Sequence, residues 1–229
     1  MCGRYAQFSS AQELSDVFNV QVCTPECAQL LPSWNVAPTQ AVRIVRETVL
    51  GPERAVRTLE LARWGLVPSW AKDPTIGTRL INARVETVTQ KPSYRGPIRY
   101  SRCLVPADGY YEWQAPAPGA RLKTPHYLRR VDGAPLAFAG LAALWREELL
   151  TCTIITGPAR AELAHIHDRE PLQIPDDAVS TWLDPDLTDA EEASALLSGE
   201  RPALTAHVVS REVNAVRNNT PHLIEPVHS

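Results

Sequence analysis

The chain has 229 residues, of which 44% are hydrophobic, and a formal net charge of −3. This length fits one large domain or two small ones, and the apolar content is enough for a substantial core. No apolar run of about 18 residues and no charged-then-apolar leader occurs, so we expect a cytoplasmic protein without a membrane span or secretory signal.

Three short helices are predicted in chain order. Ser10-Ala11-Gln12-Glu13 is a capping box that begins the first helix. Pro158 at a first-turn position predicts a second helix leading toward His167. Thr188-Asp189-Ala190-Glu191 is another capping box and begins the third. One apolar face is expected on the first helix, formed by Leu14, Val17 and Phe18.

Strands are expected to outnumber these helices. Short runs rich in β-branched, aromatic and aliphatic residues alternate with turn signals, without a regular strand-helix repeat. This pattern favours an α+β fold over a doubly wound sheet. The predicted strands are Ala41–Val49, Leu59–Trp64, Cys103–Pro106, Tyr110–Trp113, His126–Val131, Leu136–Leu144, Thr151–Thr156 and Leu204–Val209.

Charge and cysteines are distributed unevenly. Six basic residues and one acid lie from Arg79 to Arg102, whereas eight acids and no Lys or Arg lie from Asp176 to Glu200. We therefore expect a basic face and an acidic face, although a high-GC genome would also enrich arginine. The five cysteines form no framework pattern, which suits a reducing compartment, and no disulfide is assumed.

The most informative residue is Cys2, because removal of Met1 would leave it as the N-terminus. Cys2 would then carry an α-amine and a thiol on neighbouring carbons. The amine can attack an aldehyde to give an imine, and the thiol can close on the same carbon to give a thiazolidine. An α-amine has a pKa of about 7.7 to 8.0, against roughly 10.4 for lysine, so a useful share of it is already the neutral nucleophile at pH 7. An incidental cysteine in a frayed terminus is the alternative reading.

Four other segments carry candidate chemistry. Trp70 lies in a Pro-rich loop and can stack on an unpaired base, although tryptophan is more often a core residue. Asn82 and Arg84 alternate in the basic segment, so in an extended chain they face the same way. Glu112 lies among three aromatics, and desolvation would raise its pKa toward neutrality. His167 can exchange protons at physiological pH, and no cluster at matching spacing makes its neighbourhood a metal site.

Taken together, these segments resemble the SOS response-associated peptidase (SRAP) domain family, whose members process abasic sites and crosslink to DNA. Nearly the whole chain is covered, in the family's order, and the ordered set of motifs is highly specific. The motifs are Met1-Cys2-Gly3-Arg4-Tyr5, Trp34–Pro38, Arg63–Trp70, Asn82–Thr87, Gly109–Trp113, His167-Asp168-Arg169, Val209–Asn214 and Leu223–Pro226.

The resemblance implies a single α+β domain over residues 1–229, on an antiparallel, barrel-like sheet with peripheral short helices, acting as a monomer without cofactor or metal. It implies a partner, single-stranded DNA containing abasic sites, and association with the nucleoid on damage. The catalytic positions carried over are Cys2, Asn82, Glu112 and His167. The DNA-contacting positions are Arg4, Asn35, Pro38, Trp70, Arg84, Thr156 and Arg169.

One departure and two alternatives stay open. Glu170 stands where many members carry Met or a basic residue, and it would either weaken DNA binding or retune His167. An N-terminal-nucleophile amidohydrolase, similar to class II glutamine amidotransferases, would use the Cys2 thiolate on an amide. A non-catalytic single-stranded DNA-binding domain would leave Cys2 inert. An unclosed imine would also permit weak lyase activity.

Overall fold

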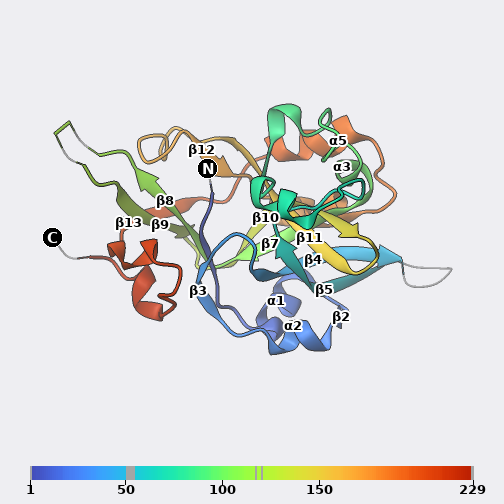
Figure 1. The fold of residues 1–229 in the computed structure, drawn as a ribbon, viewed down its shortest axis with the longest axis horizontal. Helices are drawn as coiled ribbons and strands as arrows, with labels where there is room; N and C mark the ends of the chain where they lie inside the picture. Colours follow the sequence, from blue (N-terminus) through green and yellow to red (C-terminus); the bar gives the residue numbers. More distant parts are fainter. Residues whose placement is uncertain (1, 50–54, 117, 120, 228–229) are drawn as a thin grey trace.

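Strands dominate the structure, and the expected α+β class is confirmed (Figure 1). The computed structural model describes residues 2–49, 55–116, 118–119 and 121–227. Its strands are β1 (Tyr5–Gln7), β2 (Val22–Cys23), β3 (Ser33–Val36), β4 (Ala41–Val49), β5 (Ala55–Trp64), β6 (Asn82–Arg84), β7 (Arg102–Ala107), β8 (Gly109–Gln114), β9 (Thr124–Arg130), β10 (Leu136–Trp145), β11 (Leu149–Pro158), β12 (Arg169–Pro171) and β13 (Leu204–Val208).

The helices are short and lie around the sheets (Figure 1). The α-helices are α1 (Ala11–Phe18), α2 (Pro25–Gln29), α3 (Pro97–Tyr100), α4 (Val179–Leu183) and α5 (Ala190–Ala195). The 3-10 helices are η1 (Pro74–Arg79), η2 (Val85–Thr87), η3 (Asp176–Ala178), η4 (Leu196–Ser198), η5 (Arg211–Asn214) and η6 (Pro221–Ile224).

The larger sheet closes into a barrel. Its strand order is β12-β11-β10-β7-β4-β5-β2, and β5 also pairs with β11, which joins β11, β10, β7, β4 and β5 into a ring. The pairs within the ring are antiparallel except the closing one, where Thr151 and Cys152 lie parallel to Arg63 and Trp64. The expected barrel-like sheet is therefore present, and a parallel seam closes it.

A tight backbone crossing follows this seam. After Trp64 the chain turns at Gly65, whose φ is +128°, and a Cβ there would lie 2.6 Å from the carbonyl oxygen of Gly77. Only glycine tolerates both conditions. The chain then returns as β6, which runs parallel to β11 with Asn82 opposite Ile154. The crossing thus places the segment containing Asn82 beside the barrel wall.

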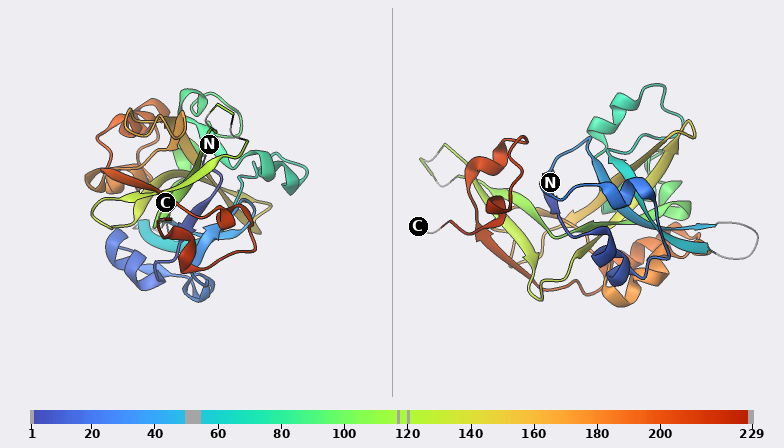
Figure 2. Two further views of the ribbon diagram at one scale, coloured as in Figure 1. Left: turned by 90° about the vertical axis from the view of Figure 1, so that its left-hand side faces the viewer. Right: turned by 90° about the horizontal axis from the view of Figure 1, so that it is seen from below.

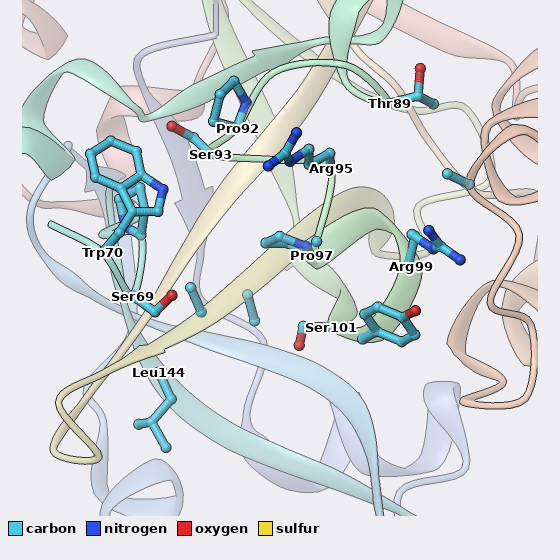
Figure 3. Close-up of a pocket in the computed structure, with 16 residues that line it drawn as sticks. Ser69, Trp70, Thr89, Pro92, Ser93, Arg95, Pro97, Arg99, Ser101 and Leu144 are labelled. Carbon is cyan, nitrogen blue, oxygen red and sulfur yellow. The ribbon is translucent and has the colours of Figure 1, made fainter.

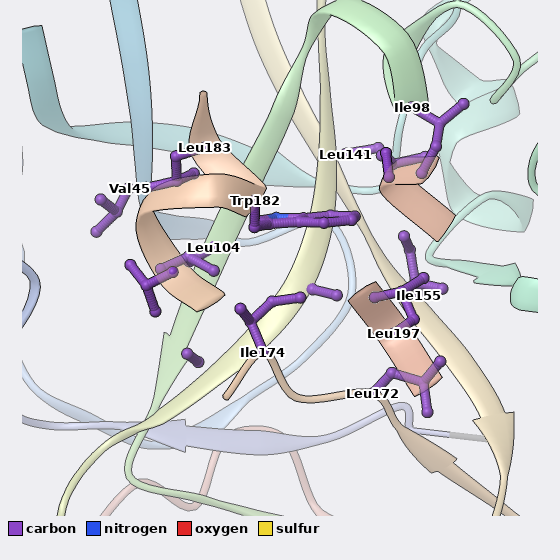
Figure 4. Packing of buried hydrophobic residues seen from close by; sticks show 14 of the residues in the cluster. Val45, Ile98, Leu104, Leu141, Ile155, Leu172, Ile174, Trp182, Leu183 and Leu197 are labelled. Atoms are coloured by element: carbon purple, nitrogen blue, oxygen red, sulfur yellow. The ribbon is translucent and has the colours of Figure 1, made fainter. Parts of the chain in front are cut away.

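Alternation along the barrel strands separates two cores. Val42 and Ile44 belong to the cluster that contains Cys2, whereas Val45 belongs to another cluster together with Trp182. Successive side chains of a strand point to opposite faces, so the first cluster is the barrel interior and the second lies under the helices. Figure 4 shows this second cluster packed around the indole of Trp182, which is fully buried.

Strand β1 belongs to the second sheet, whose order is β13-β9-β8-β1-β3. Tyr5 lies opposite Val36 on β3 and Tyr110 on β8, and its ring packs edge-on against Trp64 of the barrel with centroids 5.0 Å apart. The strand crosses the middle of the molecule (dark blue, Figure 2). The N-terminal strand is therefore both an element of one sheet and a filling for the interior of the other.

The predicted helices are confirmed in part. Ser10 and Glu13 form the capping box of α1, but Val17 is 49% exposed, so the expectation that it shares the buried face with Leu14 and Phe18 is wrong. In α5 the cap is Asp189, which accepts from the N–H groups of Glu191 and Glu192, one residue later than predicted. Among the described residues no helix is long and apolar enough to cross a membrane.

The helix predicted to begin at Pro158 is wrong. Pro158 is the last residue of β11 and pairs with Arg169 of β12, so the chain there is committed to the sheet. Residues 161–166 form turns, through which Leu163 and Ile166 still reach the barrel interior. Each predicted strand overlaps an observed strand. Five short strands were not predicted: β1, β2, β3, β6 and β12.

Candidate active site

Cys2 and Asn82 meet at the edge of the barrel interior. The side chain of Cys2 is completely buried in the interior cluster. Asn82 donates from Nδ2 to the carbonyl oxygen of Cys2 at 2.7 Å, and the Oδ1 of Asn82 is buried without a hydrogen-bond partner among the described residues. The structure therefore places an amide oxygen that can accept an N–H next to the residue expected to carry the nucleophile.

Glu112 supplies a carboxyl with a shifted pKa. It lies on β8 opposite His126 of β9 and is 3% exposed. Burial raises the pKa of Glu112 to about 7 from an ordinary 4.5, as its aromatic neighbours predict. The Glu112 charge also contributes to the raised pKa of the Cys2 thiol, for which burial is the larger cause. Glu112 can therefore give and take a proton near neutrality beside Cys2.

His167 is held as a neutral imidazole. Its Nδ1 lies 2.9 Å from Oδ1 of Asp168, which by itself would favour a protonated ring, but the same nitrogen accepts the backbone N–H of Arg169 at 3.0 Å. The backbone contact is the more decisive, because Asp168 is 87% exposed and water screens its charge. Burial lowers the pKa of His167. The ring proton is therefore assigned to Nε2.

Arg169 ties two segments of the site together. Its guanidinium donates to both carboxylate oxygens of Glu86, at 2.5 and 3.1 Å, and to the carbonyl oxygen of Thr156 at 2.6 Å. Thr156 is fully buried, whereas Arg84, opposite it on β6, is exposed. The sequence analysis did not identify the contact of Glu86 with Arg169. The only indication of it was that Glu86 is the single acid in the basic segment.

Arg4 and Asn35 hold a C-terminal strap, which we define as residues 211–219. Arg4 donates to Oδ1 of Asn35 at 2.8 Å and to the carbonyl oxygen of Val213 at 2.7 Å, and its guanidinium carbon lies 6.0 Å from the ring centroid of Trp113. Asn35 is 1% exposed. Its Nδ2 donates to three carbonyl oxygens of the strap, those of Val213, Ala215 and Asn218.

The other expected DNA-contacting residues lie farther out. Pro38 is half-buried just after β3, and Trp70 is 57% exposed at the rim of a surface groove. The structure thus gathers Cys2, Asn82 and Glu112 closely and leaves Trp70 on a surface apart from them.

Glu170 does not face a groove. It is 1% exposed and accepts from Arg160 at 3.1 Å and from Arg201. Because side chains alternate along β12, Glu170 points away from the face that carries Arg169. The expected position beside a DNA groove is therefore wrong, and the carboxylate is paired with two guanidiniums instead. The network joins β12 to the segment before β13.

Not every arginine of the basic segment serves a basic face. Arg102 is 5% exposed, and its guanidinium donates to the carbonyl oxygens of Ile98, Arg99, Trp182 and Asp184. The expectation that the segment as a whole presents its charge outward is therefore wrong at Arg102, which caps carbonyls instead. Within the described ranges no group of His, Cys, Asp or Glu side chains is arranged to hold a metal ion.

Comparisons with known proteins identify a family model and relatives that match this chain. The pattern of the SOS response associated peptidase (SRAP) family matches residues 1–216. The abasic site processing protein YoqW of Bacillus subtilis (strain 168) is 39% identical, over 98% of this chain and 99% of its own. The abasic site processing protein YedK of Escherichia coli (strain K12) is 30% identical, over 99% of this chain and 100% of its own.

A solved structure supports the fold. The crystal structure of a protein from Bacteroides thetaiotaomicron covers 99% of this chain and 100% of its own, with a TM-score of 0.84 and 23% identity. At that identity the likeness concerns the arrangement of strands and helices and carries no statement about activity.

Proposed function

We propose, from the premise that this chain belongs to the SRAP family, that it captures abasic sites in single-stranded DNA through Cys2. The observation that carries the proposal is the contact of Asn82 with Cys2, beside a Glu112 carboxyl whose pKa is about 7. Removal of Met1 would free the Cys2 α-amine. The product is a thiazolidine that joins Cys2 to C1′ of the ring-opened deoxyribose.

The covalent steps balance without a cofactor. As the ring opens, His167 gives its Nε2 proton to the sugar ring oxygen while Nε2 takes the proton of the C1′ hydroxyl, so the aldehyde is exposed and the imidazole ends neutral. The Cys2 amine adds to C1′ while Oδ1 of Asn82 accepts an N–H and fixes the direction of attack. Glu112 protonates the hydroxyl of the carbinolamine, which leaves as water, and the Glu112 carboxylate then takes the proton of the iminium nitrogen to give the imine. The Cys2 sulfur then bonds to C1′, and the thiol proton ends on the nitrogen.

The raised pKa of the Cys2 thiol supports this order of events. Burial keeps the thiol protonated at neutral pH, so the amine is the better first nucleophile. An amidohydrolase would need the thiolate to attack first, which this environment disfavours. Reversal of the same steps, with Glu112 and His167 in the opposite roles, would release the DNA slowly.

DNA would be held mainly through its backbone and by stacking. Arg84 is exposed beside Asn82, and the exposed indole of Trp70 offers a surface for a base. Such contacts give affinity with little sequence preference. Arg169 would contact phosphate only by sharing a guanidinium already bonded to Glu86.

The test is adduct formation by protein whose intact mass lacks one methionine. Incubated with single-stranded DNA that carries one abasic site, it should give an adduct that survives SDS. Cys2→Ala should give none, and the matched control Cys23→Ala, at a half-buried cysteine of β2, should react as the wild type does. Glu112→Gln should slow the reaction by roughly 100-fold or more, as loss of an acid-base group does.

Three outcomes would contradict the proposal. Equal adduct from Cys2→Ala would remove the thiazolidine. Release of ammonia from glutamine would favour the amidohydrolase. Affinity that is equal with and without the lesion, and that never survives denaturation, would leave a plain single-stranded DNA-binding protein.

A further inference from the structure

A groove of about 660 Å³ lies on the surface beside β10 and α3 (Figure 3). Three stretches of chain line it: residues 68–70, the loop and helix from 89 to 101, and residues 142–144 of β10, with Ala190 at one end. None of its lining residues is acidic. Its polar and aromatic side chains include Trp70, Arg95, Arg99 and Tyr100.

Two aromatic rings stand open at this groove. Trp70 is 57% exposed and Tyr100 is 63% exposed. The guanidinium of Arg99 lies 5.3 Å from the Tyr100 ring centroid, and Arg95 projects between Trp70 and Arg99 in the close-up (Figure 3). Open rings interleaved with guanidiniums match the alternation of base and phosphate in a single strand, since bases stack on rings and arginines bind phosphate.

The groove wall is rigid before any ligand arrives. Tyr94 and Ile98, between the groove residues in sequence, are buried in the core beneath the helices. Arg102 donates to the carbonyl oxygens of Ile98 and Arg99, at 2.8 and 3.0 Å, which fixes the end of α3. A wall held in this way loses little conformational entropy on binding.

The same wall is anchored to the candidate active site. The hydroxyl of Tyr94 donates to the backbone carbonyl oxygen of Asn82 at 3.1 Å. Ser93 and Arg95, the neighbours of Tyr94, both line the groove. A single hydrogen bond, from Tyr94 to Asn82, therefore connects the groove wall to the residue whose side chain contacts Cys2.

The charged residues around the groove indicate where a strand of DNA would lie. At the Ala190 end α5 begins, with exposed Glu191 and Glu192, which would repel a polyanion. At the other end, Trp70 also borders a second hollow, whose charged lining residues are Lys72, Arg79 and Asp73, so basic residues outnumber the acid there. A strand of DNA would thus enter at the end formed by Trp70 and Arg95, pass Tyr100 and Arg99, and leave before α5. Arg99 marks this limit, because its Nε donates to the carbonyl oxygen of Thr188 at 3.0 Å.

We propose that this groove binds the nucleotides that flank the abasic residue, with Tyr100 as a second stacking surface beyond Trp70 and with Arg95 and Arg99 on the phosphates. The inference rests on the proposed function, because it takes the strand to be the one whose lesion reacts with Cys2. Its consequence is that affinity grows with the length of strand beyond the lesion.

The experiment compares two oligonucleotides with one abasic site. The short one carries only the nearest neighbours of the lesion, and the long one extends on both sides. Binding is measured by fluorescence anisotropy in a Cys2→Ala background, so that no covalent adduct interferes. Arg95→Ala and Tyr100→Ala are the variants, and Arg129→Ala, at an exposed arginine of β9 in the other sheet, is the control.

The long oligonucleotide should bind the parent protein about tenfold more tightly than the short one, as one added stacked base allows. Tyr100→Ala should remove most of that advantage, and Arg95→Ala should also lower the slope of log affinity against log salt by about 0.7. The short oligonucleotide should bind all variants alike, and Arg129→Ala should change nothing.

An advantage for the long strand that persists in both variants would overturn the groove assignment. Competition by polyglutamate as effective as that by undamaged single-stranded DNA would also overturn it, in favour of an acidic polypeptide. These results are independent of the proposed function. That function fails if protein with intact Cys2 forms no adduct with the short oligonucleotide, whatever the length dependence.

Discussion

Replacing Glu112 with glutamine tests whether its carboxyl is protonated in the folded protein. The folded-state pKa of about 7 exceeds the ordinary 4.5, so the folded protein binds the carboxyl proton of Glu112 more tightly than the unfolded chain does. The associated stability is fully present below about pH 4.5 and is lost as pH rises through 7. At about 1.4 kcal/mol for each pKa unit, the loss at pH 8 is about 3 kcal/mol.

Glutamine resembles the protonated carboxyl, so Glu112→Gln should keep this stability at every pH. The free energy of unfolding, measured by urea titration at several pH values on proteins with the same N-terminus by mass, should be similar for variant and wild type near pH 4.5. By pH 8 the variant should be the more stable by about 3 kcal/mol. Glu148→Gln, at an exposed site, should stay within about 0.5 kcal/mol of the wild type throughout. A variant whose advantage does not change with pH, or a wild type that is more stable at pH 8, would refute the reasoning.

Three further changes have defined outcomes. Tyr5→Phe removes a hydroxyl that is buried without a hydrogen-bond partner among the described residues. The free energy of unfolding should therefore stay the same or rise by up to about 1 kcal/mol, seen as an equal or higher melting temperature. A marked fall in the melting temperature would show that the hydroxyl has a partner. Glu170→Gln deprives Arg201 and Arg160 of their shared carboxylate and should cost about 3 kcal/mol in urea unfolding, while adduct formation under folding conditions persists. In the native protein at pH 8, Cys2 should resist a thiol reagent until urea is added, as peptide mass mapping would reveal, because burial raises the pKa of its thiol.

The strands could be predicted because their signal is local. Alternation in Ala41–Val49 and the apolar run in Leu136–Leu144 each report which residues face a core, and both strands appear at nearly the expected bounds. The closing of the barrel could not be predicted in the same way. The pairing of Cys152 with Trp64 depends on a crossing at Gly65 that joins residues far apart in sequence.

The same distinction between local and long-range signals applies to the candidate site. Glu112 could be found because the aromatics that desolvate it are its sequence neighbours, and the structure confirms the raised pKa. The contact of Glu86 with Arg169 spans 83 residues, and the contacts of Asn35 with the C-terminal strap span more than twice that number. No periodicity reports such contacts, so the resemblance could name Asn35 but could not show that its amide is committed to the strap.

The N-terminal strand links folding to chemistry in this protein. Pairing of β1 with β3 and β8 and the packing of Tyr5 on Trp64 fix the backbone that leads to Cys2, and Asn82 grips the Cys2 carbonyl. The contacts that fill the barrel are therefore also the contacts that fix the position of Cys2, the proposed nucleophile. For the proposed reaction, a Cys2 fixed in this way needs no ordering that would oppose the capture of an aldehyde. It also buries the thiol, which in the proposed mechanism reacts only after the amine has bound the sugar carbon. Burial of Cys2, which would hinder a thiolate enzyme, thereby suits an amine that reacts first and a thiol that closes the ring.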